Sequence, residues 1–250
     1  MVAFFEGNMI KEIYKRILFY ASVPKCVNCE SILDYEDECF CKECRPVYEE
    51  FKLRNCALCS RPLTECSCSN KYMRSCGIKS VIKVYRYRAW EKDIPSNKII
   101  YSLKEQNRSD VFDFLASELY TSITNSLTVD KDKFVIVNIP RRSKSIIDFG
   151  YDHAREIAKR LAKRLDIDYI PVLKSLSKKA QKETIGSERA TNAVFAFRKK
   201  HTARLKGKIV IIVDDIITTG SSMVSAAKLL RKNGARKTIA ATIAIAYKNT

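Results

Sequence analysis

The sequence predicts an α/β protein built on a mainly parallel sheet, preceded by a small cysteine-rich module. Two observations carry this prediction. Strand and amphipathic-helix patterns alternate through the second half of the 250-residue chain, and all ten cysteines lie between Cys26 and Cys76. Residues 1–76 contain 11 Lys plus Arg and 11 Asp plus Glu, so the whole net charge of +18 falls in residues 77–250. We therefore expect a module of residues 1–76, with an N-terminal helix and the cysteines, and a domain of residues 77–250.

The domain is predicted from strands and helices that follow one another along the chain. Residues 134–139 (FVIVNI) and 208–213 (KIVIIV) are short, β-branched apolar runs typical of buried strands, and residues 238–246 (TIAATIAIA) form a third. Residues 153–165 and 223–230 carry apolar side chains at helical spacing. This order predicts parallel strands joined by right-handed crossovers. Ligands of such sheets bind at the carboxyl ends of the strands.

The stretch VDDIITTGSS, residues 213–222, ends the second strand with two adjacent aspartates. The carboxylates of Asp214 and Asp215 would repel each other and lose solvation there, so we expect them to serve a ligand. The small residues that follow predict a turn into a helix N-terminus, where free amides and the helix dipole favour a phosphate. These residues are Thr218, Thr219, Gly220, Ser221 and Ser222. A ribose 5-phosphate fits both features, because carboxylates accept hydrogen bonds from sugar hydroxyls and Mg²⁺ would offset their charge.

The cysteines form two candidate structural zinc sites, each with four thiolates at a spacing that suits a tetrahedral ion. The first set is Cys26, Cys29, Cys41 and Cys44, and the less regular second set is Cys56, Cys59, Cys66 and Cys68. Disulfides are the alternative, which a reducing compartment disfavours. Cys39 and Cys76 are left over, and we expect Cys76 to be a packed thiol. His153 and His201 have no companion at metal-ligand spacing and receive no metal role.

The segment VYRYRAW, which ends at Trp90, has two interpretations. Alternation puts Tyr85 and Tyr87 on one strand face and Arg86 and Arg88 on the other, with Trp90. Arginine beside an aromatic ring suits single-stranded nucleic acid. We favour a strand whose tyrosines fill the core.

No apolar run approaches the roughly 18 residues of a membrane span. The short run ILFYASV, residues 17–23, is too short and poorly placed for a signal peptide. We therefore expect a folded cytoplasmic protein without a transmembrane segment.

The stretch VIIVDDIITTGSS resembles the phosphoribosyl diphosphate (PRPP) signature of the type I phosphoribosyltransferases. With the cysteine knuckles before it, nearly the whole chain is similar to the ComF (ComFC-type) competence-associated family. A loop from Pro140 to Gly150-Tyr151-Asp152-His153 has the family's spacing. Gln181, Arg189, Asn192 and Phe197 match a later family pattern. The sequence departs from the family at Phe149, where Arg is usual, and at Asp152-His153, where Asn-Gln is usual.

The resemblance implies a type I phosphoribosyltransferase fold and a set of roles. Asp214 and Asp215 would bind the ribose hydroxyls and help to place Mg²⁺, and residues 218–222 would hold the 5-phosphate. Arg141 and Arg142 are candidates for the pyrophosphate loop. A polar stretch resembles the mobile lid, with Lys178, Lys179, Gln181 and Arg189. Pyrophosphate would leave through an oxocarbenium-like transition state, and an amine or base would then attack.

Three hypotheses about function remain open. The first is an active phosphoribosyltransferase associated with DNA uptake in natural transformation, with an unknown acceptor. The second is a non-catalytic PRPP sensor or single-stranded-DNA-binding accessory of competence, acting with other competence proteins; the basic domain favours binding to DNA. The third is a structural adaptor, which the intact Asp-Asp-x-x-Thr-Thr-Gly-Ser pattern disfavours.

Overall fold

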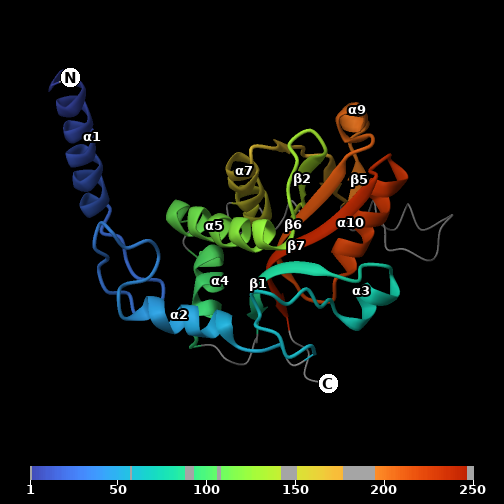
Figure 1. Cartoon of the computed structure of the whole chain (residues 1–250), viewed down its shortest axis with the longest axis horizontal. Helices are drawn as coiled ribbons and strands as arrows, with labels where there is room; N and C mark the ends of the chain where they lie inside the picture. The colour runs from blue at the N-terminus through green and yellow to red at the C-terminus, as the bar shows by residue number, and fades with distance from the viewer. Residues whose placement is uncertain are drawn as a thin grey trace.

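A five-stranded, wholly parallel sheet forms the centre of the computed structural model (Figure 1). The strand order is β1-β7-β6-β2-β3. The strands are β1 (Val81–Tyr87), β2 (Phe134–Asn138), β3 (Asp168–Tyr169), β6 (Ile209–Ile217) and β7 (Lys237–Ala246). The structure describes residues 2–56, 58–87, 93–105, 108–141, 151–176 and 195–246. The predicted mainly parallel sheet is confirmed.

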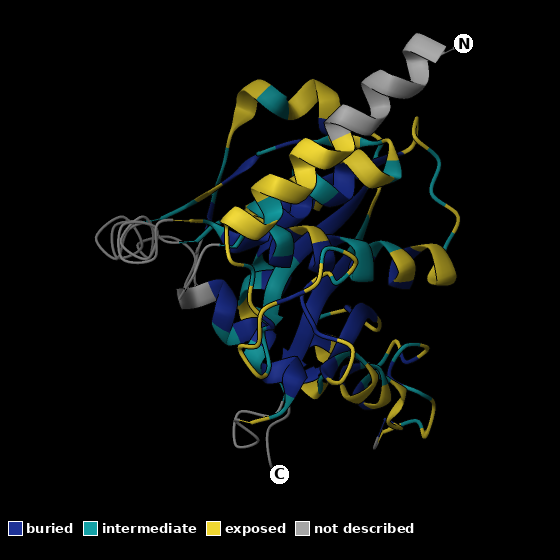
Figure 2. Ribbon diagram, turned by 90° about the vertical axis from the view of Figure 1, so that its left-hand side faces the viewer, coloured by how far each residue is buried: buried dark blue, intermediate teal, exposed yellow. Residues whose placement is uncertain are grey.

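Helices cover both faces of this sheet (Figures 1 and 2). α5 (Ser109–Ser126) and α7 (His153–Leu165) share one core with the sheet, and α10 (Ser221–Lys232) shares the other. Side chains of β6 alternate between the two cores: Ile211 lies on the α5 and α7 side and Ile212 on the α10 side. The continuous apolar strands of the sequence therefore reflect burial on both faces.

β6 is longer than the sequence predicts, and this places the aspartates. Its pairing with β2 ends at Asn138 opposite Val213, but its pairing with β7 continues to Ile217 opposite Ile245. Asp214 and Asp215 therefore lie inside β6 and just past the end of β2. The strand was predicted to end at Val213 because the apolar run stops there.

The remaining elements lie around this core. α1 (Val2–Ala21) extends away from the body of the protein, followed by α2 (Cys44–Leu53), α3 (Lys71–Ser75) and α4 (Pro95–Glu105) (Figure 1). β4 (Leu173–Ser175) and β5 (Phe195–Phe197) form an antiparallel pair. The short helices η1 (Lys199–His201) and α9 (Thr202–Leu205) lead into β6. Within the described residues, none of the helices is long and apolar enough to cross a membrane.

The segment that carries the first cysteine set, residues 26–53, packs directly on the main domain. Phe40 contacts Phe114 of α5 with ring centroids 5.7 Å apart, and the Tyr48 hydroxyl donates to Glu118 at 3.0 Å. Phe40, Tyr48 and Phe114 belong to one buried cluster. Packing against α5 therefore adds to whatever stability a bound metal supplies to this segment. The boundary near residue 77 remains a prediction.

β1 explains part of the VYRYRAW segment. Tyr85 is fully buried, as expected for a tyrosine that fills the core. Arg86 is 6% exposed, and its Nη2 donates to Cys56 Sγ at 3.2 Å. Arg86 therefore contacts a cysteine of the second candidate zinc set and does not form a stacking surface. Arg88 and Trp90 lie outside the described residues.

Candidate functional site

The two aspartates lie at the carboxyl end of the sheet, where each has its own partners. Asp214 Oδ1 accepts from the Asp215 amide at 3.0 Å, and Asp215 Oδ1 accepts from the Ile216 amide at 2.8 Å. Thr242 of β7 donates its hydroxyl to the Asp215 carbonyl at 3.1 Å. Backbone amides thus orient both carboxylates, and the neighbouring strand holds the main chain at Asp215.

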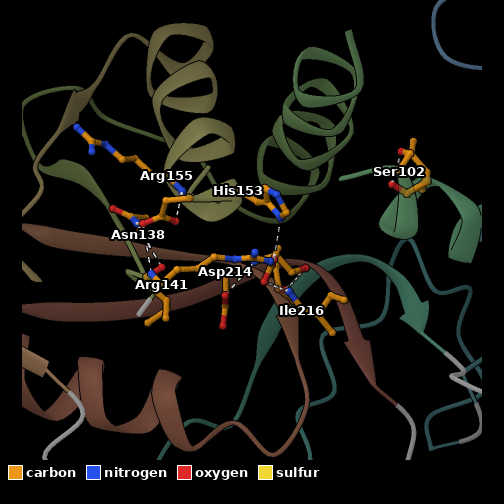
Figure 3. A network of polar contacts seen from close by, with 12 residues as sticks. Ser102, Asn138, Arg141, His153, Arg155, Asp214 and Ile216 are labelled. Carbon is orange, nitrogen blue, oxygen red and sulfur yellow. Dashed lines mark hydrogen bonds and ion pairs between the residues drawn. The ribbon is translucent and has the colours of Figure 1, made fainter. Parts of the chain in front are cut away.

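A cation and an imidazole face Asp215. Arg141, just past β2, donates from Nη2 to Asp215 Oδ2 at 2.9 Å. His153, the first residue of α7, is fully buried, and its Nδ1 lies 3.8 Å from the same oxygen (Figure 3). The site thus unites the ends of two strands and the start of a helix.

These surroundings give the two carboxyl groups different protonation. Burial, reinforced by the charge of Asp215, raises the pKa of Asp214 well above its usual value. Burial opposes ionisation of Asp215 too, but His153 and the Arg141 guanidinium outweigh it and hold the pKa of Asp215 below its usual value. In the ligand-free protein Asp215 is therefore the anion, and Asp214 binds a proton more readily than an ordinary aspartate does.

Asp152 joins the site through a second network. It caps α7 by accepting from the Arg155 amide at 3.1 Å, and its other oxygen accepts from Asn138 Nδ2 and the Arg141 amide, both at 3.3 Å (Figure 3). Tyr169 donates its hydroxyl to Asn138 Oδ1 at 2.7 Å. Because it accepts from the Arg141 amide, Asp152 fixes the backbone that carries Arg141. Burial also raises the pKa of Asp152.

The turn after β6 leads into the N-terminus of α10. Thr218, Thr219 and Ser221 are exposed, and the Thr219 hydroxyl lies 3.1 Å from that of Ser221. The first amides of a helix have no partner within it, so they can receive an anion. Hydroxyls and amides here form a site suited to a phosphate group.

Gly220 makes this turn possible for two reasons. Its φ is +82°, in the left-handed region that favours glycine, and a Cβ built on it would lie 2.3 Å from Met73 Cγ. Met73 is fully buried, so it has little room to move. The second reason cannot be inferred from the sequence, because Met73 lies 147 residues earlier in the chain.

The cysteines gather into the two predicted clusters. In each cluster the four sulfur atoms lie within 4.8 Å of one another. Cys29 Sγ is 3.7 Å from Cys41 Sγ. A tetrahedral zinc with Zn–S bonds of 2.3 Å has an S–S edge of about 3.8 Å, so the donor set and the spacing both suit zinc. Cys39 stands apart as a buried thiol, and burial raises its pKa.

We predict that the purified protein carries close to two zinc ions. Four-thiolate sites of this kind bind zinc tightly and contribute to folding. Elemental analysis of protein prepared without chelator measures the number. One ion would mean that the Cys66-Ser-Cys68 set does not bind metal, and a fully folded protein with none would contradict both sites.

Several predicted residues lie outside the described part of the chain. They are Arg142, Phe149, Gly150, Lys178, Lys179, Gln181, Arg189 and Asn192. The sequence did not point to His153 or Asn138 as parts of the site. A polar Asn138 at the end of a buried strand and the departure at Asp152-His153 were the available signals.

The fold and this site define a class of protein. A model of the phosphoribosyl transferase domain matches residues 152–250. The adenine phosphoribosyltransferase of Bordetella avium is 30% identical over 129 residues, which cover 45% of this chain and 70% of that protein. The chain belongs to the phosphoribosyltransferase family.

Within that family, most of the chain is similar to a competence protein. Competence protein F of Haemophilus influenzae is 25% identical over 225 residues, which cover 84% of this chain and 92% of that protein. The resemblance to the ComF-type family is thereby confirmed.

Other matches are more partial. The ribose-phosphate pyrophosphokinase of Sulfolobus acidocaldarius is 41% identical over 86 residues, and this chain spans 25% of its length. Among solved structures, adenine phosphoribosyltransferase from Saccharomyces cerevisiae has a TM-score of 0.35 at 17% identity, with 60% of this chain and 73% of that chain covered.

Proposed function

We propose that this protein binds PRPP with Mg²⁺ at the end of β6 and transfers the phosphoribosyl group to an acceptor as part of DNA uptake. One observation carries the proposal. A single segment, residues 214–222, joins two fixed carboxylates to an exposed hydroxyl-rich turn at a helix N-terminus. Sugar hydroxyls and a 5-phosphate are the groups these two features would hold. The similarity to Competence protein F supports the link to DNA uptake.

In this proposal Arg141 changes partners when the ligand binds. Without ligand it donates to Asp215 Oδ2 at 2.9 Å. A bound diphosphate carries more negative charge than one carboxylate and competes for the guanidinium, which can bind phosphate oxygens in bidentate fashion. Asp215 is then free to accept from a ribose hydroxyl.

The proposed chemistry depends on positioning and charge. Loss of pyrophosphate leaves positive charge on the ribose, and the ionised Asp215 would stabilise that charge electrostatically. The amides at the start of α10 would hold the 5-phosphate and so fix the sugar for attack by the acceptor. Mg²⁺, when bound, would neutralise part of the diphosphate charge.

The test is PRPP binding followed by a search for turnover. We expect PRPP with Mg²⁺ to raise the midpoint of thermal unfolding, because a ligand that binds only the folded state stabilises it. Absence of binding by calorimetry at millimolar PRPP would refute the proposal. A pyrophosphate-release screen with bases, amines and oligonucleotides then tests catalysis. PRPP binding without release for any acceptor would favour the non-catalytic PRPP sensor.

A second candidate function is binding of single-stranded DNA, favoured by the +18 net charge that falls in residues 77–250. We predict non-specific binding whose affinity falls steeply between about 50 and 200 mM salt, because bound Lys and Arg release counterions from the phosphates. Fluorescence anisotropy with a labelled oligonucleotide measures this. Affinity that does not change over this range would rule out charge as the cause.

In either case we propose that the protein acts in the cytoplasm, where cysteine thiolates stay reduced.

A further inference from the structure

A short segment next to the second cysteine cluster supports the turn of residues 218–222, which we call the phosphate-binding turn. Asn70 Nδ2 donates to the Thr219 carbonyl at 3.0 Å and lies 3.4 Å from the Thr218 carbonyl. Met73, three residues later, packs against Gly220. The turn is therefore supported by a hydrogen-bond donor and by a buried side chain, and both come from the α3 segment.

Asn70 is itself held in place by α3. It is the N-cap residue of that helix, and its Oδ1 accepts from the Met73 amide at 2.8 Å. One end of its amide group thus binds its own helix and the other binds the turn. The two supports of the turn, Asn70 and Met73, are joined by this hydrogen bond.

The second cysteine cluster (Cys56, Cys59, Cys66 and Cys68) anchors the start of this segment. Cys68 precedes Asn70 by two residues and pairs with Ser80 in a β-bridge. The buried ammonium of Lys83, on β1, donates to the carbonyls of Cys66 and Cys68. Only Ser69 separates Cys68 from Asn70, and its hydroxyl donates to the Ile78 carbonyl at 2.8 Å. The position of Cys68 therefore determines where Asn70 can lie.

Apart from these polar contacts, the second cluster has little apolar packing to support it. Its own apolar core is small, with Cys56, Leu63 and Cys66 as the buried members. The first cluster, by contrast, belongs to the large core that includes α5. Loss of a metal ion should therefore disturb the backbone more at the second cluster than at the first.

We infer that metal at the second cysteine cluster and ligand at the phosphate-binding turn stabilise each other, with Asn70 and Met73 as the link. This rests on the proposed function for its ligand. Coupling of two binding sites is reciprocal, so metal should raise PRPP affinity and PRPP should raise metal affinity by the same factor. Asn70 is in this view a positioning residue, which orients the turn without touching the reacting atoms.

A matched pair of variants tests the link. Asn70→Ser keeps an oxygen that can cap α3 but is too short to reach the Thr219 carbonyl, and it adds no charge near the phosphate. We expect PRPP to bind about tenfold more weakly to this variant, with the melting temperature nearly unchanged. Asn28→Ala is the control, because Asn28 Nδ2 donates to Cys44 Sγ of the first cluster at 3.2 Å. It should bind PRPP as the parent does, and an equal loss in both variants would overturn the inference.

Zinc affinity tests reciprocity. Cys29→Ser disables the first cluster and Cys59→Ser the second, so the remaining zinc in each variant reports on one site. In equilibrium competition with a chromogenic chelator, PRPP should raise the zinc affinity of the Cys29→Ser protein several-fold and leave that of the Cys59→Ser protein unchanged. No gain in the first, or an equal gain in both, would overturn the inference.

A measurement without PRPP separates this inference from the proposed function. Hydrogen exchange of the amides of residues 219–224 should accelerate when zinc is removed from the second cluster of the Cys29→Ser protein. Removal of zinc from the first cluster, in the Cys59→Ser protein, should leave the exchange rates of these amides unchanged. Should the parent fail to bind PRPP, the proposed function fails, and exchange at the turn still decides the coupling. Unchanged exchange in the Cys29→Ser protein would refute it.

Discussion

Replacing both Asp214 and Asp215 by asparagine should weaken PRPP binding by at least about a hundredfold. Asparagine keeps the size of each side chain. It removes the charge that Asp215 carries and that Asp214 would take on beside bound Mg²⁺, and with it the charge-assisted hydrogen bonds to the ribose hydroxyls, each worth roughly 1.5–3 kcal/mol. Two such losses exceed the 2.7 kcal/mol or so that corresponds to a hundredfold change. Calorimetry with Mg²⁺ and PRPP measures the effect. Asp168→Asn is the control, because Asp168 lies exposed on β3 and pairs with Arg204.

The single variants should change stability in opposite directions at neutral pH. The pKa of Asp214 is raised in the folded protein, so its ionisation costs stability once the pH exceeds the unfolded value of about 3.9. Asp214→Asn removes that cost. The pKa of Asp215 is lowered, so its ionised form contributes stability above the same pH. Asp215→Asn also leaves Arg141 beside a neutral group, and should cost about 1–3 kcal/mol.

Acid pH should reduce both of these stability differences. In Mg²⁺-free buffer the gain in Asp214→Asn and the loss in Asp215→Asn should both shrink as the pH falls below about 4, where the unfolded carboxyl groups take up protons. Urea denaturation at pH 7 and pH 3.5 measures both differences.

PRPP binding by the double variant at parental affinity would show that these aspartates are not the ribose site. The phosphoribosyl proposal would then depend on the turn alone.

The parts of the fold that follow from local pattern could be predicted from the sequence. α7 begins at His153 and ends at Leu165, as its apolar stripe predicts, because that stripe faces the sheet. The end of β6 could not be predicted. Its last four residues are held by pairing with β7 alone, and that asymmetry depends on strand order, which no local pattern encodes.

The site shows the same division. The carboxylates and the hydroxyl-rich turn form one continuous stretch, so their chemistry can be inferred from residue types. The partners of that stretch come from distant segments: Arg141 and His153 meet Asp215, and Asn70 meets Thr219. The departure at Asp152-His153 marked this histidine, but nothing in the sequence placed it beside the carboxylate of Asp215. Only the packing of α7 on the sheet brings it there.

Replacing Gly220 by valine should abolish PRPP binding and destabilise the fold. The left-handed φ of +82° costs an L-residue about 1–2 kcal/mol, and the new Cβ would lie 2.3 Å from Met73 Cγ and 2.5 Å from Met73 Sδ. Overpacking of this kind costs a further 1–3 kcal/mol or so, giving a total loss of about 2–5 kcal/mol. The displaced turn would no longer present its amides to a phosphate. Chemical denaturation and calorimetry measure the two effects.

Gly207 provides the control that separates strain from contact. Its φ is +77°, and a Cβ built on it has no atom within 4 Å, so Gly207→Ala should lose only the 1–2 kcal/mol or so of backbone strain and keep PRPP binding. Gly220→Ala should lose more stability than Gly207→Ala, and adding Met73→Ala should restore part of the difference, because truncation at Met73 makes room for the new Cβ. If PRPP binding returns with it, Gly220 is required by the packing of α3 against the turn. If stability returns without binding, the Cβ itself blocks the phosphate. Equal stability of Gly220→Ala and Gly207→Ala would show that Met73 does not constrain the turn.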